Sequence, residues 1–102
     1  MFESSRPRFA SFGIVSALPG EIIDQVWYII DNNLKGMFRL DEIIGFNLVT
    51  NDGRLRFDFL QGNEVVASFD TPFPASSDYP AALWAYDDGS NQIIMLPKEP
   101  LG

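Results

Sequence analysis

The sequence of 102 residues contains no cysteine and no histidine. Without cysteine there is no disulfide, no thiolate nucleophile and no cysteine-based zinc or iron–sulfur site, and without histidine there is no imidazole base. The common hydrolase triads are therefore excluded. The sequence predicts no catalytic residue, no cofactor and no metal site, and it favours a non-enzymatic protein.

Long apolar runs are also missing. The longest apolar stretches are only a few residues long, far below the roughly 20 residues that span a bilayer. The first twenty residues lack the continuous apolar run and small-residue cleavage site of a secretory signal. We therefore expect a cytoplasmic protein that does not contact a membrane.

Basic residues are few. Seven Lys and Arg stand against fourteen Asp and Glu, so the net charge is −7. Residues 58–102 contain seven of the acids and only one base, Lys98. This balance opposes nucleic-acid binding, which relies on basic side chains facing phosphates. We expect a protein partner instead, and a basic partner is expected on the C-terminal half.

Apolar residues, in contrast, are plentiful. They make up 46% of the chain, and 14% of all residues are aromatic, which is sufficient for a folded core. The length predicts a single domain over residues 1–102. We expect residues 1–7 to form a loose N-terminal arm and residues 97–102 to form a tail that leaves the fold.

The clearest local pattern is an amphipathic helix from Pro19 to about Leu34. At helical spacing the apolar residues share one arc: Ile22, Ile23, Val26, Trp27, Ile29, Ile30 and Leu34. Pro19 suits the first helical turn, and Lys35 with Gly36 supplies a cation and a stop at the other end.

Six stretches have the composition or the alternation of β-strands. They are residues 8–15, 43–49, 54–60, 64–70, 81–86 and 92–96. Positive-φ turn residues at 51–53 and 61–63 predict hairpins, whereas residues 71–80 contain three prolines and predict a loop. The inward positions are Ile44, Phe46, Leu48, Leu55, Phe57, Phe59, Val65, Ala67 and Phe69. The order predicts an α+β fold with a single helix on a five- to six-stranded, mainly antiparallel meander sheet.

One helix cannot cover such a sheet, because a helix is about as wide as two strands. The last two strands are apolar on both faces: Trp84 and Tyr86 oppose Leu83, and residues 93–96 are all apolar. The cover is a curled sheet, the proline-rich loop with Phe73 and Tyr79, or a second subunit. A large exposed apolar patch is typical of an interface, so a homodimer is a serious alternative.

Two sets of polar side chains are candidate interaction surfaces. The polar arc of the helix presents Glu21, Asp24, Tyr28 and Asp31, and the outward face of strand 54–60 presents Arg54 and Arg56. Arg6 and Arg8 form a similar pair, so neighbouring strands would unite four cations in one stripe. A solvated helix face and a cross-strand ion pair between Arg56 and Asp58 are the structural alternatives.

Two further patterns have structural explanations that are favoured. Residues 87–91 offer several oxygens near a glycine, but they lack the ligand spacing of a calcium loop and are typical of a hairpin turn. Trp27, Trp84 and the nine Phe residues are typical of core packing, with an aromatic-lined ligand cavity as the alternative.

Three stretches together resemble a known family. They are residues 8–14, residues 18–23 running into Trp27 and Ile30-Asp31, and residues 95–99. The chain resembles small uncharacterised proteins of Firmicute bacteria, of the staphylococcal and streptococcal kind, classed as a domain of unknown function. The resemblance implies a bacterial cytosolic protein and brings no catalytic residue, substrate or cofactor.

The function favoured by these observations is a non-enzymatic protein-interaction or regulatory module. Its partner is another protein, with a second copy of the chain included among the candidates, and neither nucleic acid nor membrane is expected. The alternative is a small-ligand binding domain with an aromatic-lined cavity.

Overall fold

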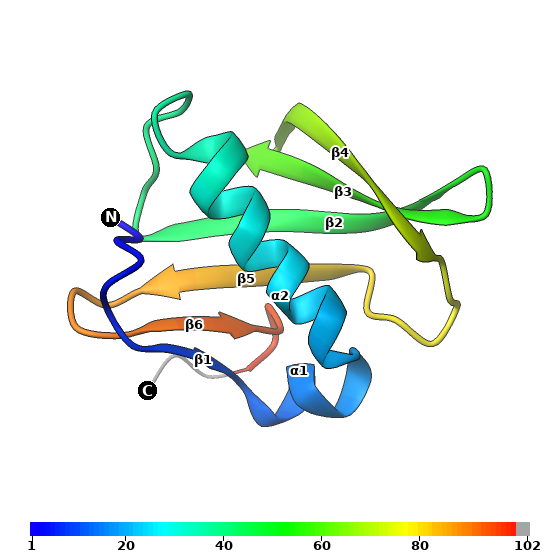
Figure 1. Cartoon of the computed structure of the whole chain (residues 1–102), viewed down its shortest axis with the longest axis horizontal. Coiled ribbons are helices and arrows are strands. Elements are labelled where there is room, and N and C mark those ends of the chain that lie inside the picture. Colours follow the sequence, from blue (N-terminus) through cyan, green and yellow to red (C-terminus); the bar gives the residue numbers. More distant parts are fainter. Residues whose placement is uncertain (100–102) are drawn as a thin grey trace.

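The computed structural model describes residues 1–99 and consists of one six-stranded sheet with helices packed on one face (Figure 1). Its elements are β1 Arg8–Ala10, α1 Phe12–Ala17, α2 Gly20–Ile29, the π-helical turn η1 Ile30–Leu34, β2 Ile43–Asn51, β3 Arg54–Gln61, β4 Glu64–Pro74, β5 Ala82–Asp87 and β6 Gln92–Met95. The α+β class is confirmed. The sheet is mixed, however, and there are two α-helices in place of the single predicted one. Residues 100–102 of the predicted tail lie outside the described residues.

The strand order is β1-β6-β5-β2-β3-β4. Strands β2, β3 and β4 form the predicted meander, but β5 returns to the free edge of β2 and β6 then pairs with β5. The short β1 lies parallel to β6, with Phe9 opposite Ile93. The continuous five-strand meander was therefore wrong. Sequence patterns show which residues are strands, whereas the edge that accepts β5 depends on tertiary packing.

The first predicted strand, residues 8–15, ends early at Ala10. Ser11 then caps α1, since its Oγ accepts a hydrogen bond from the Ile14 N–H at 3.2 Å. This N-cap overrides the β-propensity of the following aromatic and β-branched residues. Ile14 is consequently buried on a helix and Phe12 is 84% exposed.

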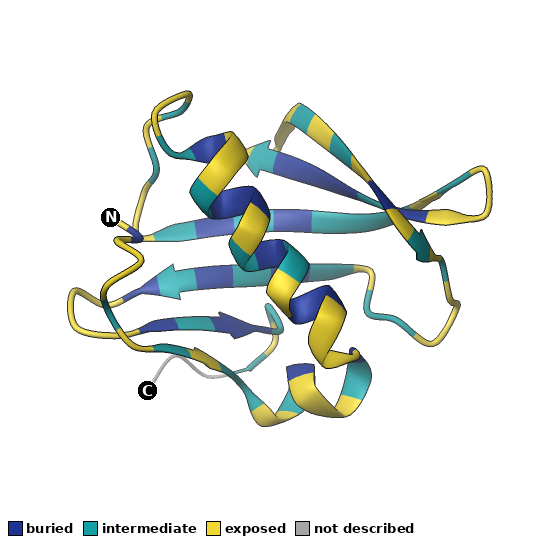
Figure 2. Ribbon diagram, in the orientation of Figure 1, coloured by how far each residue is buried: buried dark blue, intermediate teal, exposed yellow. Residues whose placement is uncertain are grey.

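The amphipathic helix is confirmed. Pro19 is the N-cap of α2, and η1 continues the helix to Leu34, where the Lys35 N–H donates to the Ile30 carbonyl at 3.0 Å. The buried side chains alternate with exposed ones along α2, which crosses the sheet diagonally (Figures 1 and 2). Trp27 is half-buried at the margin of the core.

The β2–β3 hairpin also forms as predicted. Asp52 and Gly53 have φ values of 52° and 77°, the paired positive φ of a type I′ turn. The core-facing residues of these strands are confirmed as Ile44, Phe46, Leu48, Leu55, Phe57 and Phe59.

Strand β4 differs from the prediction in length and in register. It extends to Pro74, beyond the predicted end at Asp70. A register shift opposite Phe59 and Leu60 moves Val65 out of the inward set, and Val65 is 50% exposed. A β-bulge inserts one residue and so reverses the faces on one side of it.

The N-terminal segment that the sequence predicts to be a loose arm is held against the fold. Phe2 is fully buried, and its N–H donates to Asp87 Oδ2 at 2.6 Å. Arg6 Nη1 binds Asp87 Oδ1 at 2.8 Å, and Gln92 Nε2 donates to the Glu3 carbonyl at 2.7 Å. These contacts join residues more than 80 positions apart, which no local sequence pattern reveals.

The core lies between α2 and one face of the sheet. Phe73 on β4 and Tyr79 on the following loop pack against this core, so the proline-rich segment contributes to its cover. The prediction of a loop over residues 71–80 was wrong for residues 71–74, which belong to β4. Ile14 of α1 and the buried residues of α2 pack in the same core. Within residues 1–99, no helix covers the opposite face of the sheet.

Candidate interaction surface

We call the sheet face opposite α2 the open face. Strand alternation and the pairing register assign its residues. Its members are Phe9, Ile43, Gly45, Asn47, Val49, Arg54, Arg56, Asp58, Leu60, Val65, Ser68, Asp70, Ala82, Trp84, Tyr86, Ile93 and Met95. Nearly all of them are exposed or half-buried, whereas their sequence neighbours on the core face are mostly buried.

The half of the open face formed by β1, β6, β5 and the start of β2 is apolar. Phe9 is 52% exposed at its margin, and Trp84, Tyr86 and Ile93 are half-buried. A Cβ placed on Gly45 would lie 3.6 Å from the Trp84 ring, so the indole rests over the bare backbone of β2.

The half formed by β3 and β4 is polar and internally paired. Asp58 accepts hydrogen bonds from Arg56 Nε at 3.1 Å and from Ser68 Oγ at 2.7 Å. Asp70 accepts a hydrogen bond from Asn51 Nδ2 at 3.0 Å. Arg56 does pair with Asp58, but the two residues are neighbours along β3 and the pair is not the predicted cross-strand one.

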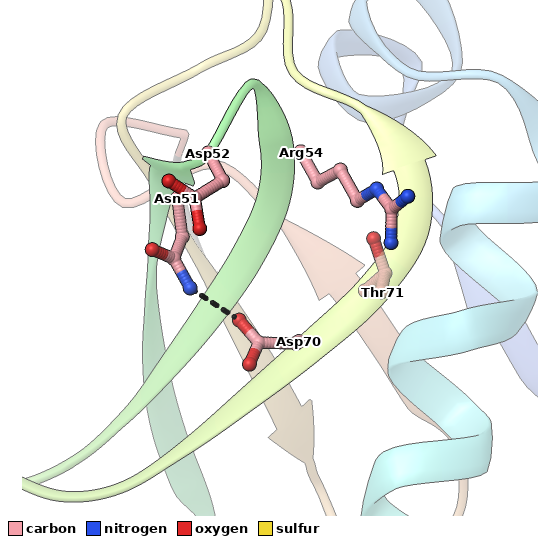
Figure 3. A pocket seen from close by; sticks show the side chains of 5 residues that line it. All are labelled: Asn51, Asp52, Arg54, Asp70 and Thr71. Atoms are coloured by element: carbon pink, nitrogen blue, oxygen red, sulfur yellow. Dashed lines mark hydrogen bonds between the residues drawn. The ribbon is translucent and has the colours of Figure 1, made fainter.

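Arg54 lies beside a polar pocket of about 380 Å³ at the end of the β2–β3 hairpin. Figure 3 shows its side chain reaching toward Thr71 on β4, with Asp52 and Asp70 also lining the pocket. Arg54 has no ion-pair partner within residues 1–99, whereas Arg56 is bound by Asp58. Of the two predicted arginines, Arg54 is thus the one available to a partner.

The helix residues predicted as an interaction surface lie on the other side of the molecule from the two arginines. Glu21, Asp24 and Tyr28 are exposed on α2. Asp31 differs, because its carboxylate is bound by Arg8 through two hydrogen bonds of 2.7 Å and by Lys35 Nζ at 3.4 Å. The structure therefore divides the six candidate residues into two surfaces.

The predicted stripe of four cations does not form. Arg8 is on β1 at one edge of the sheet, and β6, β5 and β2 separate it from Arg54 and Arg56 on β3. Arg8 is fully engaged: beyond Asp31, it donates to Gln92 Oε1 at 2.9 Å and lies 4.7 Å from the centroid of the Trp27 ring. The stripe was wrong because it required β1 and β3 to be neighbours.

Several acids of the C-terminal half stabilise the chain itself. Asp87, fully buried, binds Phe2 and Arg6 and also accepts the Gly89 N–H at 2.8 Å. Asp88 accepts the N–H groups of Ser90 and Asn91, and these hydrogen bonds lower its pKa. Residues 87–91 thus form the predicted hairpin turn, with their carboxylates directed at backbone amides.

Glu99 has a similar role near α1. Its carboxylate accepts hydrogen bonds from Ser11 Oγ at 2.5 Å, the Leu96 N–H at 2.7 Å and the Gly13 N–H at 3.3 Å. The bond from Ser11, followed by that from Leu96, lowers the pKa of Glu99. Asp58, Asp87, Asp88 and Glu99 are therefore bound within the chain, and the acidic surface predicted for a basic partner is reduced accordingly.

Four phenylalanine rings pack together in and around the core. Phe46 packs against Phe57 and Phe59 with ring centroids 6.0 and 5.8 Å apart, and Phe38 meets Phe59 at 5.2 Å. Three of these rings are fully buried. The pocket beside Arg54 is lined by polar side chains and not by aromatic ones.

The structure adds residues that the candidate set omitted. Trp84, Tyr86 and Phe9 lie on the open face, although aromatics in strands are most often core residues. The sequence contained one signal that Trp84 and Tyr86 face outward: residues 82–86 alternate, and Leu83 and Ala85 occupy the inward positions. Phe9 gave no such signal, since its strand has only three residues.

Comparison with known proteins gives two findings. Residues 7–99 match a family described as a staphylococcal protein of unknown function, DUF960. A solved structure, described as the crystal structure of the protein of unknown function from Enterococcus faecalis, is similar with 44% sequence identity and a TM-score of 0.93. The match covers 99% of this chain and 96% of that one. No curated protein matches the sequence.

Within the described residues, the fold is that of an α+β protein with a mixed sheet that carries helices on one face only. The family and the solved structure that match it are bacterial. The chain belongs to the staphylococcal family of unknown function DUF960, which confirms the resemblance seen in its strand, helix and C-terminal motifs. Among residues 1–99, neither helix has the length and hydrophobicity needed to cross a membrane.

Proposed function

We propose that this protein is a non-enzymatic interaction module of the bacterial cytosol and that it binds another protein through the open face. The observation that carries the proposal is the composition of this face. It presents Trp84, Tyr86 and Phe9 together with Arg54 and Arg56, and it contains no lysine. Protein interfaces are enriched in aromatic residues and arginine and depleted in lysine.

The absence of cysteine and histidine from the sequence supports a non-enzymatic role. The pKa values of three carboxylates support the same role. The pKa values of Asp31, Asp88 and Glu99 are all lowered, by hydrogen bonds to an arginine, to backbone amides and to Ser11 respectively. A general acid needs a raised pKa, so none of these three groups is suited to that role.

The experiment is affinity capture with the full chain, followed by identification of the captured protein and measurement of its affinity as a purified protein by calorimetry. We expect Arg54→Ala and Trp84→Ala to weaken binding by about tenfold or more, since arginine and tryptophan dominate interface energies. Arg39→Ala is the matched control, because Arg39 is exposed but lies outside the open face. Equal affinities for all three variants, or capture of neither another protein nor a second copy of the chain, would contradict the proposal.

A further inference from the structure

We infer that the partner of the open face is a second copy of this chain, bound face to face in a two-fold symmetric dimer. The inference rests on the proposed function and names its partner. Three features support it: the charge of the face, its size and the way its two halves are arranged.

The first feature is charge. Arg54 and Arg56 are balanced by Asp58 and Asp70, so the open face is neutral in a chain of net charge −7. Two copies of such a chain repel each other across most of their surfaces. A neutral face removes this repulsion at the contact and offers little attraction to a strongly acidic or basic partner. The charge distribution therefore favours a second copy.

The second feature is size. Six strands spaced about 4.8 Å apart and roughly 20 Å long present a flat area of about 600 Å². Stable interfaces bury about 600–1,000 Å² on each partner, so the open face is large enough for a dimer.

The third feature is arrangement. A two-fold axis that lies between the sheets and runs perpendicular to the strands places each strand of one copy over the same strand of the other. The apolar half with Trp84, Tyr86 and Ile93 then meets its own copy, and β3 with Arg56 and Asp58 does the same. An isologous contact joins the same patch of both copies, so that patch must be complementary to itself. Two stacked sheets about 10 Å apart would form a sandwich.

The test is sedimentation equilibrium of the full chain from about 1 to 100 µM. We expect a mass twice the 11.5 kDa of one chain at the higher concentrations. Tyr86→Glu places a charge on the apolar half, and we expect it to raise the dissociation constant at least about tenfold. Tyr28→Glu is the matched control on the outer surface of α2, where Tyr28 is 58% exposed, and we expect no change.

A second variant keeps the test decisive if Tyr86→Glu fails to fold. Phe9 is 52% exposed at the margin of the open face, so Phe9→Glu leaves the core intact and should also weaken the dimer. A monomer at 100 µM would overturn the inference, as would a dimer that neither variant weakens. If the wild-type chain is monomeric but binds a different protein in a Trp84-dependent manner, the proposed function stands and only the identity of the partner is wrong.

Discussion

The carboxylates of this chain differ from one another mainly in what they bind. Asp87 and Asp31 each hold an arginine, whereas Asp24 projects from α2 into solvent. Asp24 and Asp31 both belong to the polar arc of the amphipathic helix, yet only Asp31 contacts the guanidinium of Arg8. The Arg8 hydrogen bonds lower the pKa of Asp31.

This difference gives a first prediction. We expect Asp31→Asn to reduce the free energy of unfolding by about 1–2 kcal/mol, since it weakens two charge-assisted hydrogen bonds at a partly exposed site. Asp24→Asn should change stability by less than about 0.5 kcal/mol. Urea denaturation at pH 7 measures both values. Equal effects of the two variants would show that the Arg8–Asp31 pair contributes nothing.

Glu99 provides a prediction on pH. Its pKa is lowered from the ordinary value of 4.5, so the folded state favours the charged form. The stabilisation it provides is fully present above pH 4.5 and is lost as the pH falls through the lower pKa of the folded state. We expect Glu99→Gln to be less stable than wild type at pH 7, and the difference to shrink below pH 4.5.

The matched control for this experiment is Glu64→Gln, which changes an exposed glutamate at the start of β4. Urea denaturation from pH 3 to pH 7 provides the measurement. A difference between wild type and Glu99→Gln that is independent of pH would contradict the assigned role of Glu99.

Among the structural segments, the N-terminal arm differs most from its prediction. Residues 1–7 contain no helix or strand, yet Phe2 fills the core and its backbone binds Asp87. Arg8 reaches back to the Phe2 carbonyl at 3.2 Å. The arm therefore closes one end of the core beside β5 and β6.

We expect Phe2→Ala to destabilise the fold by about 3–5 kcal/mol, the usual cost of removing a buried phenylalanine ring. Phe12→Ala is the matched control, because Phe12 is 84% exposed on α1, and we expect a change below about 0.5 kcal/mol. Thermal and chemical denaturation measure both. If Phe2→Ala is as stable as Phe12→Ala, the arm is not part of the core in solution.

For the whole molecule, the relevant property is the distribution of charge. The net charge is −7, and within residues 1–99 Arg6, Arg8 and Arg56 each bind a carboxylate. Few cations therefore remain available for phosphates. Non-specific binding to DNA depends on Lys and Arg facing the backbone and weakens with salt.

We accordingly expect no binding to duplex DNA at about 0.15 M salt, even at protein concentrations near 100 µM, where typical non-specific binders do associate. Fluorescence anisotropy of a labelled duplex is the measurement. Anisotropy that rises with protein and falls with salt would reveal a cationic surface that the structure does not contain within residues 1–99.

Local patterns predicted α2 and the β2–β3 hairpin closely. The helix depends on a 3.6-residue period with a proline start, and the hairpin on strict alternation around a turn that tolerates positive φ. Both signals lie within about 16 residues of sequence. The inward positions Phe46, Phe57 and Phe59 followed directly, because alternation fixes the face once the strand is correct.

The candidate interaction residues were predicted from the sequence only in part. Arg54 and the exposed residues of α2 were identified from their outward positions, whereas the role of Asp31 and the arginine stripe depended on contacts between distant elements. The β-propensity of residues 12–15 gave a wrong prediction of a strand, because the Ser11 cap stabilises a helix there.

The sequence by itself determined which side-chain types are absent, the net charge, the family, the main helix and the inward faces of most strands. Each of these depends on residue identity or on short-range periodicity. Tertiary structure alone decided the strand order, the burial of Phe2 of the N-terminal arm beside β5, the ion pair of Arg8 with Asp31 and the neutrality of the open face. These features join residues that are far apart in sequence, and the free edges of several strands could have accepted the same partner. Only the simultaneous packing of all elements against one core selects among them.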